Sequence, residues 1–108
     1  MKSASLIAAV FLGTVLAVSA ADVSELWGKH CASCHGKDGK GETKAGRKAG
    51  TKDQTDAEYQ AGLKDDKMFT SIKDGLMDGA KEKMKPFKEK LTDDEIKALV
   101  AHVRSLKK

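Results

Sequence analysis

The segment Cys31-Ala32-Ser33-Cys34-His35 constrains this chain more than any other part of it. Two thiols three positions apart lie on one side of a helical turn, so each can form a thioether to the same edge of a porphyrin. The histidine that follows is then held under the iron, where an imidazole nitrogen can bind it. Cys-x-x-Cys-His is the signature of covalent haem attachment, and these are the only two cysteines in the chain.

Two other uses of the cysteines stay open on sequence grounds. A disulfide between Cys31 and Cys34 is possible in an oxidising compartment, but it would close a tiny loop, stabilise the fold little and leave His35 unexplained. The other alternative is a zinc site, in which the two thiolates and a histidine hold the metal in a structural module. Neither a zinc site nor a reactive dithiol requires the adjoining histidine.

Residues 1–20 have the pattern of a cleaved signal peptide. Lys2 precedes an apolar run over residues 6–18, and small residues follow it. Cleavage after Ala20 fits this pattern best, and cleavage after Ala21 fits nearly as well. The alternative is an uncleaved anchor, but the run is shorter than the ~20 apolar residues that a spanning helix needs. We therefore expect an exported, soluble protein, periplasmic in a bacterium, without stable membrane insertion.

Residues 21–108 are expected to form one small domain. Domains of this size bury a low fraction of their surface and often need a metal, a disulfide or a cofactor. A third of the chain is charged, and the domain has few large aromatic side chains: Trp27, Tyr59, Phe69 and Phe87. Because these would make a thin core, we expect a haem to fill its centre.

The charge of the chain is mildly basic, +4 overall, with lysines mixed among acidic residues. That mixture and the expected export argue against nucleic acid as a partner. Five lysines lie close together in the sequence, at Lys81, Lys83, Lys85, Lys88 and Lys90. They form either an ordinary solvated surface or part of a docking ring that steers acidic redox proteins to an exposed haem edge.

Two helices are indicated in the first two thirds of the domain. Residues 22–30 form a short amphipathic stretch, with Asp22 as its cap and Glu25 three positions later. Residues 65–73 form a better helix, which Gly75 ends.

The last helix has the clearest pattern in the sequence. Thr92 and Glu95 make a capping box, and apolar residues then recur at helical spacing: Ile96, Leu99, Val100, Val103 and Leu106.

The remaining segments have weaker patterns. Residues 36–50 are rich in glycine and lysine and lack apolar periodicity, which indicates a loop. A short helical turn is expected around residues 57–60. Residues 76–90 also lack periodicity and contain the only proline, Pro86. We find no β-hairpin signal, no internal repeat and no second domain.

An iron bound by His35 has a sixth coordination position. Besides several lysines, its candidate ligands are Met68, Met77, Met84, His30 and His102. His30 adjoins the first cysteine and cannot reach the opposite face of the haem. Met68 lies on the apolar side of a helix, where a core role is favoured, and His102 flanks the apolar stripe of the last helix.

Met84 is the favoured distal ligand, and Met77, in a loop, is a further candidate. Met84 lies in an irregular segment just before the last helix. Pro86 stiffens that segment, and Phe87 can anchor it against the haem.

Over nearly all of residues 21–108, the chain resembles the small monohaem class I c-type cytochromes. The resemblance rests on five segments, Cys31–Gly36, Gly39–Gly41, Ile72–Gly75, Met84–Phe87 and Leu91–Ile96. A single haem signature, a downstream Met-x-Pro-Phe and a terminal amphipathic helix are together a specific combination. The resemblance implies a compact all-α fold of about three to five helices around one covalently bound haem, with the N- and C-terminal helices crossing.

By the same resemblance, Trp27 takes an aromatic position that packs on the last helix, near Leu99, Val100 and Val103. The chain departs from the family pattern at two places, one at the helix crossing and one in the loop after the haem signature. Members often carry a glycine about one turn before that aromatic, where this chain has Val23, so we expect a slightly wider helix crossing. Many also have a proline in the loop after the haem, whose carbonyl orients the proximal histidine. This loop has no proline, so another carbonyl must orient His35.

The resemblance and the ligand set predict a periplasmic one-electron carrier rather than an enzyme. Cys31 and Cys34 would attach one haem c per chain, with His35 as the proximal iron ligand and Met84 as the distal one. A thioether ligand favours ferrous iron, and six-coordinate iron leaves no site for a substrate. We expect a monomer that passes electrons while redox proteins dock transiently at the haem edge.

One alternative function stays open. If Met84 binds the iron weakly or not at all, the chain would be an open-site haem protein with peroxidase-like or gas-sensing chemistry. Nothing in the sequence resembles an acid–base pair for peroxide chemistry. Such a protein would lack the far-red absorption band of sulfur-bound ferric haem.

Overall fold

The computed structural model describes residues 18–108. Most of the predicted signal peptide, including Lys2 and the apolar run up to residue 17, therefore lies outside the described residues. The cleavage site and the domain boundary at residue 21 stay predictions. No helix among residues 18–108 is long and apolar enough to cross a membrane.

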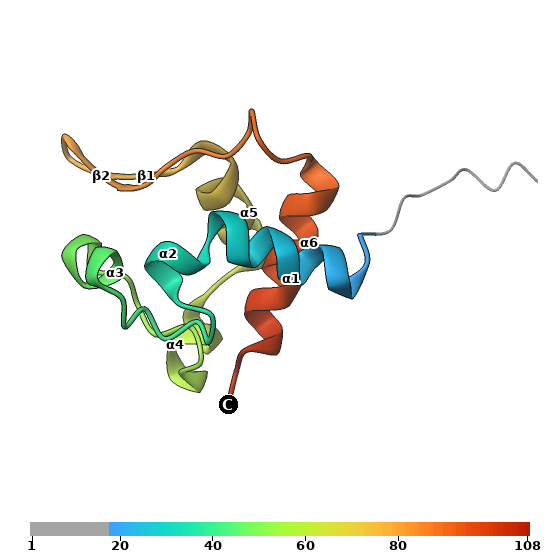
Figure 1. Cartoon of the computed structure of the whole chain (residues 1–108). Helices are drawn as coiled ribbons and strands as arrows, with labels where there is room; N and C mark the ends of the chain where they lie inside the picture. Colours follow the sequence, from blue (N-terminus) through green and yellow to red (C-terminus); the bar gives the residue numbers. More distant parts are fainter. Residues whose placement is uncertain (1–17) are drawn as a thin grey trace, which may run out of the picture.

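The described residues form six helices and one two-stranded antiparallel sheet (Figure 1). In chain order these are α1 (Ala20–His30), α2 (Ala32–His35), α3 (Lys44–Ala49), α4 (Ala57–Gly62), α5 (Asp65–Asp74), β1 (Leu76–Asp78), β2 (Lys81–Met84) and α6 (Asp93–Ser105). The predicted all-α class is confirmed. There are more helices than the three to five expected, because the cysteine-containing turn and part of the glycine-rich stretch are themselves helical.

α1 begins two residues before the predicted start. Ser19, rather than Asp22, is its N-cap: the Ser19 hydroxyl accepts a hydrogen bond from the Asp22 backbone N–H at 3.2 Å. Asp22 lies in the first turn instead, where its negative charge still favours the positive end of the helix dipole.

α3 was not predicted, because a short exposed helix has no apolar stripe to detect. Its ends are fixed locally. The Thr43 side chain accepts a hydrogen bond from the Gly46 N–H, and Gly50 ends the helix in the left-handed conformation at φ 72°.

The predictions for α4, α5 and α6 are confirmed. Gly75 ends α5 with φ 80°, as expected for a glycine cap. The capping box of α6 is complete: the Thr92 N–H donates to Glu95 Oε1 at 2.9 Å, and the Glu95 N–H donates to Thr92 Oγ1 at 3.1 Å.

The core lies where α1 crosses α6 (Figure 1). Its ten buried apolar residues are Val23, Trp27, Cys31, Met68, Ile72, Leu91, Ile96, Leu99, Val100 and Val103. Trp27 thus shares a core with the α6 residues that it was expected to contact. The largest fully buried side chains are only those of Ile96 and Leu99, so the core that the protein supplies by itself is thin.

The β1–β2 hairpin contradicts the expectation that residues 76–90 contain no hairpin. Asp78 pairs with Lys81 and Leu76 with Met84, with an irregularity between Leu76 and Met77. Residues 76–82 are exposed, so no alternation of buried and exposed positions marks the strands in the sequence. The available signal was Gly79, which takes φ 59° in the two-residue turn.

Candidate haem site

The two cysteines and the histidine lie on the single turn of α2 and the residue before it. The His35 N–H donates to the Cys31 carbonyl at 2.9 Å, and the Cys34 N–H donates to the same oxygen at 3.3 Å. Helical winding therefore places the two thiols one above the other, with the histidine directly after them. Cys31 is buried and Cys34 half-buried, and both are free thiols, so they do not form the disulfide considered above.

Burial affects the chemistry of the first thiol. It raises the pKa of Cys31 to about 11, so at neutral pH this free group is an uncharged thiol. Among residues 18–108, no three His, Cys, Asp or Glu side chains lie together in a way that could hold a metal ion. The zinc alternative gains no support from the structure.

His35 is mostly enclosed by protein. Burial lowers its pKa, which favours the neutral imidazole, the form that binds iron. Its Nδ1 atom is buried and has no hydrogen-bond partner. The carbonyl that was expected to orient this ring is therefore not identified among the described residues.

Trp27 connects α1 to this turn in a way that the sequence did not indicate. Its indole Nε1 donates to the carbonyl of Gly36 at 3.0 Å. The Trp27 ring lies 5.6 Å from the His35 ring and 4.8 Å from the His102 ring, measured between centroids. Trp27 thus touches both the candidate iron ligand and α6.

α3 packs tightly against α2. The Thr43 hydroxyl donates to the Cys34 carbonyl at 2.8 Å. A Cβ atom at Gly46 would collide with the Cys34 carbonyl and lie 2.7 Å from the Gly41 carbonyl, so only glycine allows this approach. Thr43 and Gly46 are supporting residues that the sequence analysis missed. The N-cap position of Thr43 was visible in the sequence, but the close approach at Gly46 depends on the fold.

The predicted distal ligand, Met84, ends β2. It is half-buried and packs against the core cluster, as does Phe87. The segment after it is tied to α5, because the Phe87 N–H donates to the Ile72 carbonyl at 2.9 Å. Phe87 also makes an edge contact with His30, with 5.7 Å between ring centroids.

The other candidate ligands lie in different surroundings. Met68 is buried in the core on α5, as expected for a core filler, whereas Met77 on β1 is 61% exposed. His102 lies on α6 beside Trp27, with its Nε2 atom buried and without a partner.

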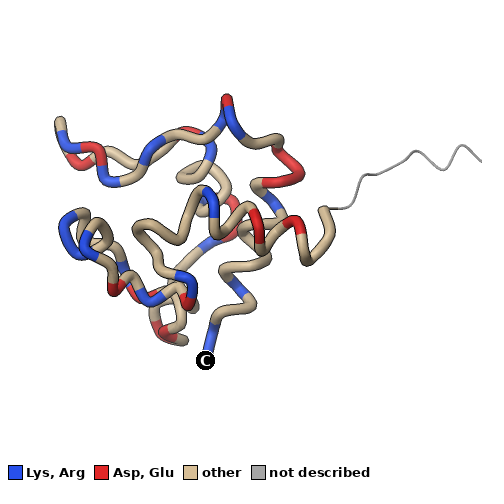
Figure 2. Tube along the Cα trace, viewed as in Figure 1, with Lys and Arg blue, Asp and Glu red and all other residues tan. Residues whose placement is uncertain are grey.

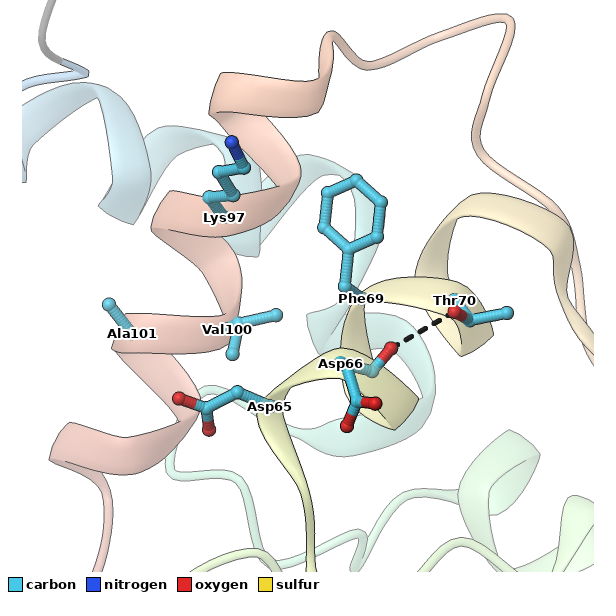
Figure 3. A pocket seen from close by; sticks show the side chains of 7 residues that line it. All are labelled: Asp65, Asp66, Phe69, Thr70, Lys97, Val100 and Ala101. Carbon is cyan, nitrogen blue, oxygen red and sulfur yellow. Dashed lines mark hydrogen bonds between the residues drawn. The ribbon is translucent and has the colours of Figure 1, made fainter.

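The structure also has an open apolar groove of about 440 Å³ between α5 and α6 (Figure 3). Phe69, Val100 and Ala101 supply its apolar lining, and Asp65, Asp66 and Lys97 lie at its border. None of the candidate haem-binding residues lines it, so this groove is not the haem site.

Comparison with known proteins decides the family. Residues 18–103 match the family described as "Cytochrome C oxidase, cbb3-type, subunit III". The chain belongs to the c-type cytochromes. It is a small class I member, and its cofactor is a covalently bound haem c with iron.

Two solved structures of c-type cytochromes resemble this cytochrome over most of its length. The structure named "KustC0563 c-type cytochrome" is 44% identical, covers 79% of this chain and 96% of its own, and has a TM-score of 0.71. A tyrosine-to-phenylalanine mutant of Kustc0563 is 43% identical, covers 80% of this chain and 99% of its own, and has a TM-score of 0.70. No curated protein sequence gives a significant match.

The residues of this cytochrome fit a covalently bound haem. The turn carries two free thiols, and the neutral imidazole follows directly. The core beside them is thin and is bordered by half-buried apolar side chains, including Met84 and Phe87. Such side chains can complete their burial against a flat apolar ring.

Proposed function

We propose that this cytochrome is a periplasmic one-electron carrier whose haem is attached through Cys31 and Cys34 and whose iron is bound by His35 and Met84. The observation that carries the proposal is the α2 turn, which presents the two thiols and the neutral imidazole at the edge of the core against which Met84 packs. The compartment is inferred from the signal-peptide pattern of residues 1–20.

The ligands have complementary roles in electron transfer. When bound, haem c supplies an iron that alternates between the ferric and ferrous states. His35 donates from a neutral ring, and the Met84 thioether favours the ferrous state and raises the reduction potential relative to a second histidine. With both axial positions filled by protein, no position remains for a substrate, which favours electron transfer over catalysis.

The distribution of charge favours acidic redox proteins as partners. Residues 37–52 and 76–90 together hold eleven Lys and Arg against five Asp and Glu, a net charge of +6. The rest of residues 18–108 holds eight against eleven, a net charge of −3. Figure 2 shows the basic residues along α3 and along the hairpin. A hydrogen bond from the Lys83 ammonium to the Ala49 carbonyl joins these two segments.

We call these two segments, 37–52 and 76–90, the basic face. They include α3, which packs on the cysteine-containing turn, and the hairpin that ends in Met84. An acidic partner guided to this face would arrive beside the proposed haem site. Charge steering of this kind speeds the encounter and suits weak, transient complexes.

The visible absorption spectrum of the purified protein, oxidised and then reduced, tests the proposal. We expect covalent haem with the far-red sulfur-to-iron band in the ferric state. Covalent haem without that band, together with a spectrum that shifts at low cyanide concentration, would contradict Met84 ligation and favour an open-site haem protein.

A further inference from the structure

Within residues 18–108, the hairpin that carries Met84 has one side-chain hydrogen bond to the rest of the domain. The Lys83 ammonium donates to the carbonyl of Ala49 at 3.2 Å, between residues 34 positions apart in the sequence. In the described residues, no other hydrogen bond or ion pair joins residues 76–84 to another element. Leu76 and Met77 on β1 are exposed, so Met84 at the end of β2 is the hairpin residue that packs against the core.

The acceptor is well suited to a cation. Ala49 is the last residue of α3, and the carbonyls of a last helical turn carry the negative end of the helix dipole. The Gly50 and Thr51 N–H groups bond to the carbonyls of Gly46 and Arg47, and among the described residues Lys83 is the donor to the Ala49 carbonyl. Lys83 is half-buried, which protects the bond from part of the competition with water.

α3 is itself fixed to the haem-attachment turn. The Thr43 hydroxyl bonds to the Cys34 carbonyl, and Gly46 allows the backbones of α2 and α3 to touch. The Lys83 bond therefore connects the segment next to Met84 with the element that packs behind Cys34. It joins the two sides of the proposed haem site.

We propose that Lys83 is a positioning residue for Met84, a proposal that rests on the ligand set given under the proposed function. Neighbouring side chains of a strand point to opposite faces, so Lys83 can bond to α3 while Met84 faces the core. Loss of the bond would let the hairpin move away more often. Each such opening would separate the methionine sulfur from the iron and expose the iron to other ligands.

The test compares Lys83→Met with Lys81→Met in the haem-containing protein. Both variants remove one positive charge from β2, but Lys81 is exposed and has no side-chain bond to another element. The measured quantity is the rate at which cyanide binds the ferric protein. We expect Lys83→Met to bind cyanide about tenfold faster than Lys81→Met, as expected for the loss of one charge-assisted hydrogen bond. Lys83→Arg, which keeps a donor, should restore most of the wild-type rate.

Hydrogen exchange of the hairpin amides supplies a second measurement that does not depend on the iron ligand. Lys83→Met should accelerate exchange in residues 76–84 relative to Lys81→Met, with unchanged far-ultraviolet circular dichroism. Equal exchange and equal cyanide binding in the two variants would overturn the positioning role. If wild-type ferric protein lacks the sulfur-to-iron band, Met84 ligation is wrong, and positioning of that ligand by Lys83 is overturned with it. Faster exchange would then show only that Lys83 holds the hairpin.

Discussion

The indole Nε1 of Trp27 donates a hydrogen bond to the carbonyl oxygen of Gly36 at 3.0 Å. Gly36 directly follows the predicted iron ligand, His35, and Trp27 is only 5% exposed. The bond therefore fixes the end of the turn from Cys31 to His35 to α1, the helix that crosses α6. Trp27 was expected only to pack between helices, but it also donates a hydrogen bond to the backbone beside the predicted iron ligand.

Trp27→Phe should destabilise the protein by about 1–3 kcal/mol, because it removes one of the two hydrogen bonds to the Gly36 carbonyl, which also accepts from the Gly39 N–H at 3.2 Å, and removes part of a buried ring. Guanidinium unfolding of the haem-containing protein measures the change. Tyr59→Phe is the matched control, since Tyr59 is 36% exposed and its hydroxyl has no hydrogen bond in the structure. Equal unfolding midpoints for the two variants would contradict this account of Trp27.

Gly46→Ala should destabilise by at least about 1–3 kcal/mol, because the new Cβ would press against the Cys34 and Gly41 carbonyls and push α3 away from α2. Gly28→Ala is the control. A Cβ at this exposed position in α1 meets nothing within 4 Å, so alanine should stabilise the helix by about 0.5–1 kcal/mol. We expect the midpoint temperature of thermal unfolding to fall for Gly46→Ala and to rise for Gly28→Ala.

Met84→Ala should abolish the far-red band of the ferric protein and lower the reduction potential on the order of 0.1 V, since the iron loses its sulfur ligand. Redox titration followed by visible spectroscopy measures both. Met77→Ala is the control, because that side chain is 61% exposed. A band that survives in Met84→Ala but disappears in Met77→Ala would transfer the distal role to Met77.

Reversing charges on the basic face should slow reaction with an anionic oxidant. We expect the double variant Lys81→Glu and Lys85→Glu to reduce hexacyanoferrate(III) several-fold more slowly than wild type at low salt. The difference should disappear near 1 M salt, where the screening length falls to about 3 Å. The same reversals at Lys64 and Lys67, outside the basic face, are the control. A similar slowing by the control pair would mean that net charge alone sets the rate.

His102 should make the protein less stable in acid. Burial lowers its pKa in the folded protein below the value of about 6.5 in the unfolded chain. The unfolded state therefore binds the proton more readily, and stability present above about pH 6.5 is lost as the pH falls through the lower, folded-state pKa. We expect the free energy of unfolding, measured by denaturant titration, to change less between about pH 7.5 and pH 5.5 in His102→Gln than in wild type. An identical difference would mean that His102 titrates normally in the folded protein.

The features predicted correctly from the sequence are those set by nearby residues. Thr92 and Glu95 are three positions apart, and their capping box forms as expected. Gly75 ends α5 because the helix needs a residue that tolerates a positive φ there. The single turn from Cys31 to His35 depends only on helical spacing, which is why the haem signature is recognisable in the amino-acid sequence alone.

Some missed features are exposed local structures without an apolar pattern, and others depend on contacts between separate segments. The hairpin lacks an alternating pattern because its residues 76–82 are exposed. Gly46 looks like any other loop glycine until the Cys34 carbonyl is placed against it. The ligation of the iron by Met84 stays a prediction from the sequence, supported by the half-buried position of the side chain against the core.

The sequence by itself determined the helical turn from Cys31 to His35, the cofactor class and the principal helices, because each depends on spacings of three or four residues. Only the tertiary structure decided how these parts are held together: Trp27 to Gly36, Thr43 to Cys34, and Lys83 to Ala49. These bonds join residues that are 9 to 34 positions apart, so they exist only after α1, α3 and the hairpin have been brought together in the folded chain. Local propensities carry no information about such contacts, since the partners are chosen by packing rather than by neighbours in the chain.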